Sequence, residues 1–261
     1  MRHLTWLART VLPPLSFFLA VLILWHVAVE AFSIKPFLLP GPLRVAAAID
    51  AHLATLLNAA WLTAMGALCG FLLSFVVGFF ISLVFSQSKI IERSLYPYAI
   101  FLQTVPIVAV APLIILWIGH GFHGVVAVSF IISLFPIIAN ATNGLTSVEQ
   151  NLVDLFQMNN ASRWQLLMKL RVPNAVPNLL TGARISSGLS VIGAIVGEFV
   201  GSEAGLGYLI LQMNFNFDLP GVFAVLIILS MMSIGLHMLV IWVQGHVVFW
   251  VDKAGNRVMG A

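Results

Sequence analysis

The sequence predicts an all-α membrane protein with about six transmembrane helices, organised as a single domain over residues 1–261. Hydrophobic residues make up 61% of the chain and charged residues only 8%, whereas soluble domains carry about 25% charged residues. The mean hydropathy is +1.05, and apolar stretches of about 20 residues recur along the chain. Helices suit this composition because they satisfy their own backbone hydrogen bonds inside a bilayer.

The first predicted span covers residues 11–32. A cleaved signal peptide is the competing interpretation, with Val29-Glu30-Ala31 as a weak cleavage site. The apolar run is long for a signal core and further spans follow, so an uncleaved helix is favoured. Prolines then interrupt the chain, and the segment around Pro42 predicts a turn that opens a short helix.

Two of the predicted spans carry stripes of small residues at every fourth position. In the second span, 58–85, the stripe is Gly66, Gly70, Ser74 and Gly78. In the fifth span, 177–200, the stripe is Gly193, Gly197 and, just beyond the span, Gly201. Small residues let another helix approach closely, so both stripes predict helix packing in preference to a ligand site.

The third, fourth and sixth spans are predicted over residues 96–118, 125–145 and 221–245. Pro106 and Pro112 fall inside the third span, where they free backbone carbonyls that neighbouring helices or a cavity must satisfy. The segment between the fifth and sixth spans, 201–220, is expected to be an external loop.

The stretch 147–172 is the one long polar interruption, and it predicts two short helices outside the bilayer. Two pairs with capping-box spacing begin these helices: Ser147 with Gln150, and Ser162 with Gln165. Asn160 favours a left-handed turn between them, and Pro173 is expected to end the second helix. Apolar residues share one face of each helix: Leu152, Leu155 and Phe156, then Trp164, Leu167 and Met168. Such a pair is expected to dock on a partner.

The basic residues place this polar stretch inside the cell. Nine of them then face the cytoplasm: Arg2, Arg9, Lys89, Arg93, Arg163, Lys169, Arg171, Lys253 and Arg257. Only Lys35 and Arg44 face outward, which is the asymmetry of the positive-inside rule. Both termini are therefore expected in the cytoplasm. The net charge of +3 reflects this topology and does not indicate nucleic-acid binding.

The polar stretch resembles a cytoplasmic loop of ABC-importer permeases, which reads Glu-Ala-Ala, three residues, Gly, nine residues, Ile-x-Leu-Pro. Asp154-Leu155-Phe156 stands in the first slot, Asn160 in the glycine slot, and Leu170-Arg171-Val172-Pro173 closes the pattern. Asp keeps the carboxylate of Glu, and Asn keeps the turn of Gly. Leu39-Pro40-Gly41-Pro42 and Gln103-Thr104-Val105-Pro106 resemble the sulfonate, nitrate and taurine branch of these permeases.

This resemblance implies a type I permease fold in the bacterial inner membrane, a homodimer, two cytoplasmic ATPase subunits and an external solute-binding protein. The residues that it implies for ATPase coupling are Asp154, Leu155, Phe156, Asn160, Ala161 and Pro173. The chain contains no Gly-Lys-Ser/Thr sequence of a P-loop. ATP and Mg²⁺ are therefore expected on the partner, and this subunit is expected to be neither an enzyme nor a holder of metal or cofactor.

Six polar residues within the spans are candidates for a translocation path. Charged groups at this depth are suspected of function, and Gly182-Ala183-Arg184 with Glu198 matches a Gly-x-Arg … Glu arrangement of the family's fifth span. Both charged residues equally suit a role in bracing the helix bundle. The uncharged candidates are Gln103, Thr104, Asn140 and Ser190.

The cargo that the resemblance implies is a small solute. It is either a vitamin precursor of pyrimidine or riboflavin type, or a sulfonate, nitrate or taurine-like compound. An ion-coupled secondary transporter that works without an ATPase is the alternative function. Such a transporter is expected to show an internal repeat and acidic sites at mid-membrane, and the sequence shows neither convincingly.

Overall fold

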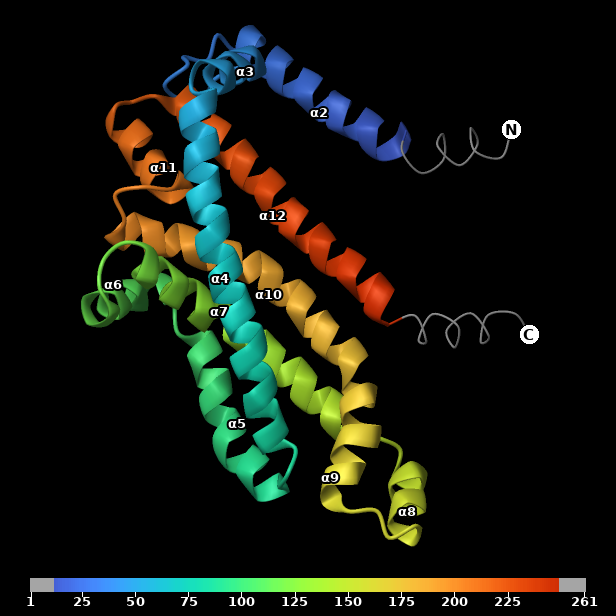
Figure 1. The fold of residues 1–261 in the computed structure, drawn as a ribbon. Coiled ribbons are helices and arrows are strands. Elements are labelled where there is room, and N and C mark those ends of the chain that lie inside the picture. The colour runs from blue at the N-terminus through green and yellow to red at the C-terminus, as the bar shows by residue number, and fades with distance from the viewer. Residues whose placement is uncertain (1–11, 249–261) are drawn as a thin grey trace. The chain divides into compact units, whose positions relative to one another are not determined.

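The computed structural model describes residues 12–248, and every regular element in this range is helical (Figure 1). Five helices of the described chain are long and apolar enough to cross a membrane. The chain divides into two compact units, one built from 1–58 and 209–229 and the other from 59–208 and 230–261.

The smaller unit contains α2 (Leu12–Ala31) and α3 (Pro42–Ala51), together with most of α11 (Leu206–Phe215) and the start of α12 (Leu219–Val247). The helix α2 matches the predicted first span. Pro42 opens α3 as predicted, because its fixed φ suits the first helical position. The Trp25 and Phe223 rings lie 5.8 Å apart between centroids and join α2 to α12 within this unit.

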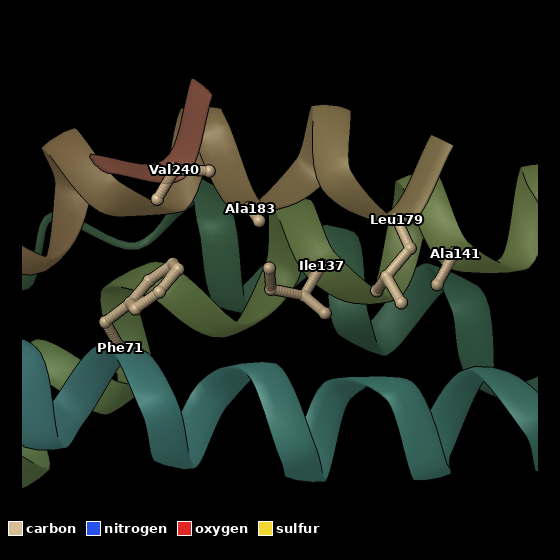
Figure 2. Packing of buried hydrophobic residues seen from close by; sticks show 6 residues of the cluster. All are labelled: Phe71, Ile137, Ala141, Leu179, Ala183 and Val240. Atoms are coloured by element: carbon tan, nitrogen blue, oxygen red, sulfur yellow. The ribbon is translucent and has the colours of Figure 1, made fainter. Parts of the chain in front are cut away.

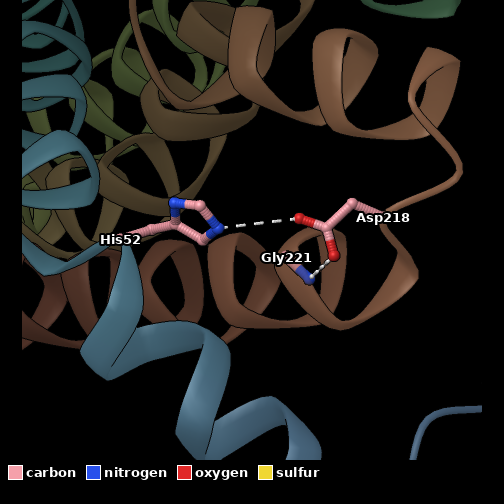
Figure 3. A network of polar contacts seen from close by, with 3 residues as sticks. All are labelled: His52, Asp218 and Gly221. Carbon is pink, nitrogen blue, oxygen red and sulfur yellow. Dashed lines mark hydrogen bonds and ion pairs between the residues drawn. The ribbon is translucent and has the colours of Figure 1, made fainter.

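A polar contact joins two turns of the smaller unit (Figure 3). His52 Nε2 lies 3.9 Å from Asp218 Oδ2. The other carboxylate oxygen, Asp218 Oδ1, accepts a hydrogen bond of 3.1 Å from the Gly221 N–H, which is one of the free donors at the start of α12.

The larger unit is organised around α7 (Phe122–Thr146), which packs along α10 (Val172–Gly201). The helix α4 (Leu53–Phe85) contributes Phe71 to the same core. Figure 2 shows its apolar centre, where Phe71 lies with residues of α7, α10 and α12: Ile137, Ala141, Leu179, Ala183 and Val240.

Both predicted stripes of small residues pack against α7, except that Gly201 lies against Ile115 of α6. A Cβ atom added to Gly193 of α10 would lie 2.6 Å from the Ser129 Cα, and one added to Gly70 of α4 would lie 2.9 Å from the Phe130 N. The Ser133 hydroxyl donates to Ser74 Oγ at 3.0 Å, and the Ser186 hydroxyl donates to the Ser133 carbonyl at 2.6 Å. The small residues therefore bring three backbones together, as predicted.

The predicted third span, 96–118, is not one helix. It is divided into α5 (Lys89–Thr104) and α6 (Ile107–Ile118), with Val105 and Pro106 in extended backbone between them. Pro106 has no N–H to donate and disfavours helical backbone in the residue before it, so the helix ends there. Pro97 and Pro112, in contrast, lie inside their helices.

The other predicted bounds need smaller corrections. The helix α7 begins three residues before the predicted span 125–145 and ends one residue after it. The helix α12 extends the predicted span 221–245 by two residues at each end. The helices α4 and α10 begin five residues before the predicted spans 58–85 and 177–200. The predicted external loop, 201–220, contains a ten-residue helix, α11, which sequence reasoning missed.

Candidate functional site

The predicted polar stretch forms two short helices, α8 (Gln150–Met158) and α9 (Arg163–Leu166). Asn160 lies in the turn between them with φ of 54°, the left-handed conformation that the sequence predicts. The Asn159 side-chain amide donates to the Leu155 carbonyl at 2.8 Å and so satisfies a free acceptor at the end of α8. The turn is therefore closed by two consecutive asparagines.

One of the two predicted capping boxes is present. The Gln165 N–H donates to Ser162 Oγ at 3.2 Å, and the Ser162 N–H donates to Gln165 Oε1 at 2.8 Å. The box predicted for Ser147 and Gln150 is wrong, because Glu149 is the residue before α8 and the Ser147 hydroxyl donates back to the Gly144 carbonyl. The Gln150 amide instead donates to Asp154 Oδ1 at 2.8 Å.

Pro173 does not end the second helix. A π-helical turn, η1 (Leu167–Arg171), follows α9 directly and leads into α10. Pro173 is the second residue of α10, where the wider turn before it accommodates a residue that has no N–H to donate. The second docking helix and the predicted fifth span are thus one continuous helical segment, Arg163–Gly201.

Two side chains tie this segment to the ends of neighbouring helices. The Arg171 guanidinium donates to the Ser86 carbonyl at 3.0 Å, just beyond the end of α4. The Asn174 amide donates to the Gly144 carbonyl at 3.0 Å, near the end of α7. Both satisfy acceptors that a helix end leaves free. They fix where α9 leaves the helix bundle.

An open pocket of about 340 Å³ lies at the turn between α8 and α9. It is lined by six residues, called here the docking surface: Leu155, Phe156, Asn159, Ala161, Gln165 and Lys169. Leu155 is 53% exposed and nearby Trp164 is 66% exposed, while Val153 and Leu167 are buried. Of the predicted apolar faces, Leu167 therefore packs into the protein core, and most of the others remain uncovered.

We expect the turn to be sensitive to its two special residues. Ser162→Ala removes a cap and should cost about 1 kcal/mol of stability. Asn160→Ala should cost a similar amount, because φ is positive there. Asn160→Gly should cost little, because glycine adopts positive φ freely. Thermal unfolding in detergent measures all three variants, and equal losses for Asn160→Ala and Asn160→Gly would contradict this account.

A second cluster of polar contacts lies at the opposite end of α10 (Figure 1). It surrounds residues 202–207, which are the short connection after α10 and the first two residues of α11 and are called here the 202–207 loop. The Gly207 N–H donates to Glu198 Oε2 at 2.7 Å, and the neighbouring Leu206 N–H donates to Thr63 Oγ1 at 2.8 Å. Glu198 is only 2% exposed. Gly205 has φ of 104°, which places its backbone directly against the Glu198 carboxylate. Thr63, 143 positions from Leu206, gave no signal in the sequence.

The candidate path residues whose side chains the structure describes do not form one site. Glu198 lines a pocket of about 230 Å³ with Glu203, and Thr104, Asn140, Arg184 and Ser190 are not among its lining residues. Ser190 is fully buried, and its hydroxyl donates to the Ser187 carbonyl of its own helix. The Thr104 hydroxyl and the Asn140 amide likewise donate to carbonyls of their own helices. The side chain of Gln103 lies outside the described residues.

Arg184 is the one basic residue of α10. It is partly buried, and its Nε atom is buried without a hydrogen-bond partner among the described residues. Buried donors are normally satisfied. Arg184 and Glu198 are fourteen positions apart on the helix, or about 21 Å, so they do not pair with each other.

Comparison with known proteins identifies the family. The family described as binding-protein-dependent transport system inner membrane component matches residues 70–253. The formylaminopyrimidine transport permease protein ThiX of Halalkalibacterium halodurans is 37% identical over 85% of this chain and 89% of its own length. The riboflavin transport system permease protein RibX of Chloroflexus aurantiacus is 33% identical over 88% of this chain and 87% of its own.

A solved structure has the same fold. A chain of the MetNI methionine ABC transporter, in an inward facing conformation, superposes with a TM-score of 0.65 at 17% identity. The match covers 74% of this chain and 96% of that chain. These findings confirm the expected all-α type I permease fold and the multi-pass inner-membrane location. The chain belongs to the binding-protein-dependent inner membrane components, and it is a permease subunit of an ATP-driven ABC importer.

Proposed function

We propose that the docking surface is the site where a separate cytoplasmic ATPase binds this permease. The observation that carries the proposal is its combination of uncovered apolar side chains with a closed, rigid turn. Leu155 of the docking surface and the nearby Trp164 are largely exposed. Contiguous exposed apolar surface outside a bilayer marks an interaction site.

The residues that act at this contact are those of the turn and its flanks: Asp154, Leu155, Phe156, Asn160, Ala161 and Pro173. Asp154 is exposed and held by Gln150, so its carboxylate faces outward from α8. We expect the ATPase to have a groove that accepts the exposed apolar side chains. We also expect it to have a hydrogen-bond donor that binds the Asp154 carboxylate. ATP and Mg²⁺ belong to that partner.

The same proposal orients the protein. With the docking surface in the cytoplasm, both termini lie inside and the 202–207 loop lies outside, where a solute-binding protein delivers cargo. Figure 1 shows α8 and α9 at one end of α10 and this loop at the other, which supports placing them on opposite sides of the bilayer. One chain supplies one docking surface, so two copies and two ATPase subunits are expected to make the transporter.

The cargo that we propose is a small nitrogen heterocycle of the pyrimidine or flavin class. The two relatives above are named for the transport of formylaminopyrimidine and of riboflavin. Their matches cover more of this chain than that of an aliphatic sulfonate permease of Bacillus subtilis, which is 34% identical over 63% of the chain. In addition, α10 offers only Arg184 as a cation for an anionic solute. Gln103, Thr104, Asn140, Ser190, Arg184 and Glu198 remain the proposed path residues.

Leu155→Glu tests the ATPase contact. A carboxylate in an apolar groove would be buried without a partner, so we expect the variant to lose at least about tenfold in affinity for the ATPase. The measurement is co-purification of the ATPase with the detergent-solubilised permease, followed by ATP-dependent uptake in proteoliposomes.

Phe217→Glu is the matched control, because Phe217 is 80% exposed but lies in the segment between α11 and α12. It should insert and retain the ATPase. Retention of the ATPase by Leu155→Glu would overturn the assigned surface. Uptake that needs an ion gradient but no ATP would overturn the role of the ATPase and favour a secondary transporter.

A further inference from the structure

A polar cavity of about 470 Å³ lies in the smaller unit, between the end of α2, the following loop and the start of α3. Four titratable side chains line it: His26, Glu30, Lys35 and Arg44. The cavity contains none of the residues assigned above to coupling or to the path. Its position and its chemistry point to a ligand of its own.

The length of α2 indicates at which level of the membrane the cavity lies. This helix has 20 residues and a mean hydropathy of 2.1, and nearly all of its surface is uncovered in the described chain. At 1.5 Å per residue it is about 30 Å long, which equals the thickness of the hydrocarbon core. Residues that follow Ala31 therefore lie at the level of the lipid headgroups.

The cavity is suited to an anion. Within the described residues, neither Lys35 nor Arg44 forms an ion pair with a carboxylate. The start of α3 opens onto the same cavity through Gly41 and Leu43, and no side chain caps it. Pro42 has no N–H and the Arg44 N–H donates to the Gly41 carbonyl, but the helix start still carries a partial positive charge, which favours a phosphate.

Large apolar side chains surround this polar cavity. Phe32, Phe37, Leu38 and Leu43 are each between 61% and 79% exposed. Isolated exposed apolar residues need no explanation, but four within twelve positions, beside two cations that form no ion pair in the described chain, match the two parts of a lipid molecule. The Lys35 ammonium lies 5.8 Å from the centroid of the Phe37 ring, so the charged and apolar groups adjoin there. The carboxylate of Glu30 would repel a purely anionic headgroup and attract one that also carries an ammonium.

We propose that this cavity binds the headgroup of a phospholipid that carries both a phosphate and a primary ammonium, as phosphatidylethanolamine does. The phosphate lies against Lys35, Arg44 and the start of α3. The ammonium lies toward Glu30. The acyl chains cover the exposed aromatic and leucine side chains, so the lipid anchors the corner between α2 and α3.

Native mass spectrometry of the delipidated full-length protein in detergent tests the proposal. Phosphatidylethanolamine, phosphatidylglycerol and phosphatidylcholine with identical acyl chains are titrated separately. The double variant Lys35→Gln/Arg44→Gln should bind phosphatidylethanolamine roughly 25-fold more weakly, because each basic residue contributes roughly fivefold near a headgroup. Glu30→Gln should remove the preference for phosphatidylethanolamine over phosphatidylglycerol.

The control is Lys89→Gln/Arg93→Gln, an equal charge change at exposed residues of α5, which should leave lipid binding unchanged. Thermal unfolding confirms that each variant is folded. Equal binding by the wild type and the Lys35/Arg44 variant would overturn the proposal. Saturation by soluble phosphoethanolamine as tightly as by the lipid would also overturn it, because the ligand would then be a free phosphate compound.

Discussion

Gly193→Ala should destabilise the protein, whereas Gly188→Ala on the same helix should leave it as stable or slightly more so. A Cβ atom at position 193 would lie 2.6 Å from the Ser129 Cα and 2.6 Å from the Ile132 Cγ2. Backbone atoms cannot rotate away, so α7 and α10 would have to separate. Overpacking of this kind costs about 1–3 kcal/mol, and Gly193→Val should lie at or above the upper end.

The control at position 188 isolates packing from helix propensity. A Cβ atom there would have no neighbour within 4 Å, and alanine is intrinsically better than glycine in a helix by up to about 1 kcal/mol. Thermal unfolding in detergent should therefore separate the two alanine variants by about 5 °C or more. A Gly193→Ala variant that unfolds together with Gly188→Ala would show that the α7–α10 contact is looser than the structure has it.

Glu198→Ala should release the 202–207 loop. The Gly207 N–H would lose its acceptor while remaining buried, and an unsatisfied buried donor of this kind costs about 1–3 kcal/mol. Hydrogen exchange should report the effect at the Leu206 and Gly207 amides, which should exchange at least about tenfold faster. Glu198→Gln retains a side-chain acceptor and should show a smaller increase.

Glu203→Ala is the matched control, because Glu203 is an exposed carboxylate of the same loop. Its amide exchange at Leu206 and Gly207 should equal that of the wild type. If Glu198→Ala slowed uptake without changing exchange in the loop, Glu198 would act on the cargo directly. If neither changed, the carboxylate would have no role in positioning this loop.

The sequence predicted those features that depend on composition or on local geometry. Mean hydropathy predicts six spans; five of them correspond to long apolar helices, whereas the third is divided at Val105 and Pro106. Four-residue spacing predicts the small-residue stripes, and their close packing was confirmed. The Ser162 capping box and the left-handed Asn160 also depend only on neighbours, and both were confirmed. The predicted capping pair at Ser147 failed because the α8 start is shifted to Glu149.

Features that depend on tertiary contacts were not predictable. The π turn before Pro173 lies next to two long-range hydrogen bonds, from Arg171 to the Ser86 carbonyl and from Asn174 to the Gly144 carbonyl. No local sequence pattern encodes these contacts. Polarity indicated Ser190 as a candidate path residue, which stays a prediction, and its burial between helices could not be predicted because it comes from close backbone packing. Glu198 was singled out by charge, and only the structure shows that it bonds the Gly207 N–H.

The unbroken run from Arg163 to Gly201 has a mechanical consequence. Its regular α-helical part, α10, has 30 residues and is about 45 Å long at 1.5 Å per residue, and the π turn η1 joins it to α9. A tilt of roughly 10° about the η1 end would move the far end of α10 by about 8 Å, given that length. If α9 binds the ATPase as we propose, a small displacement of α9 would therefore become a larger one at the other end of α10, with the π turn as the place where the segment can bend.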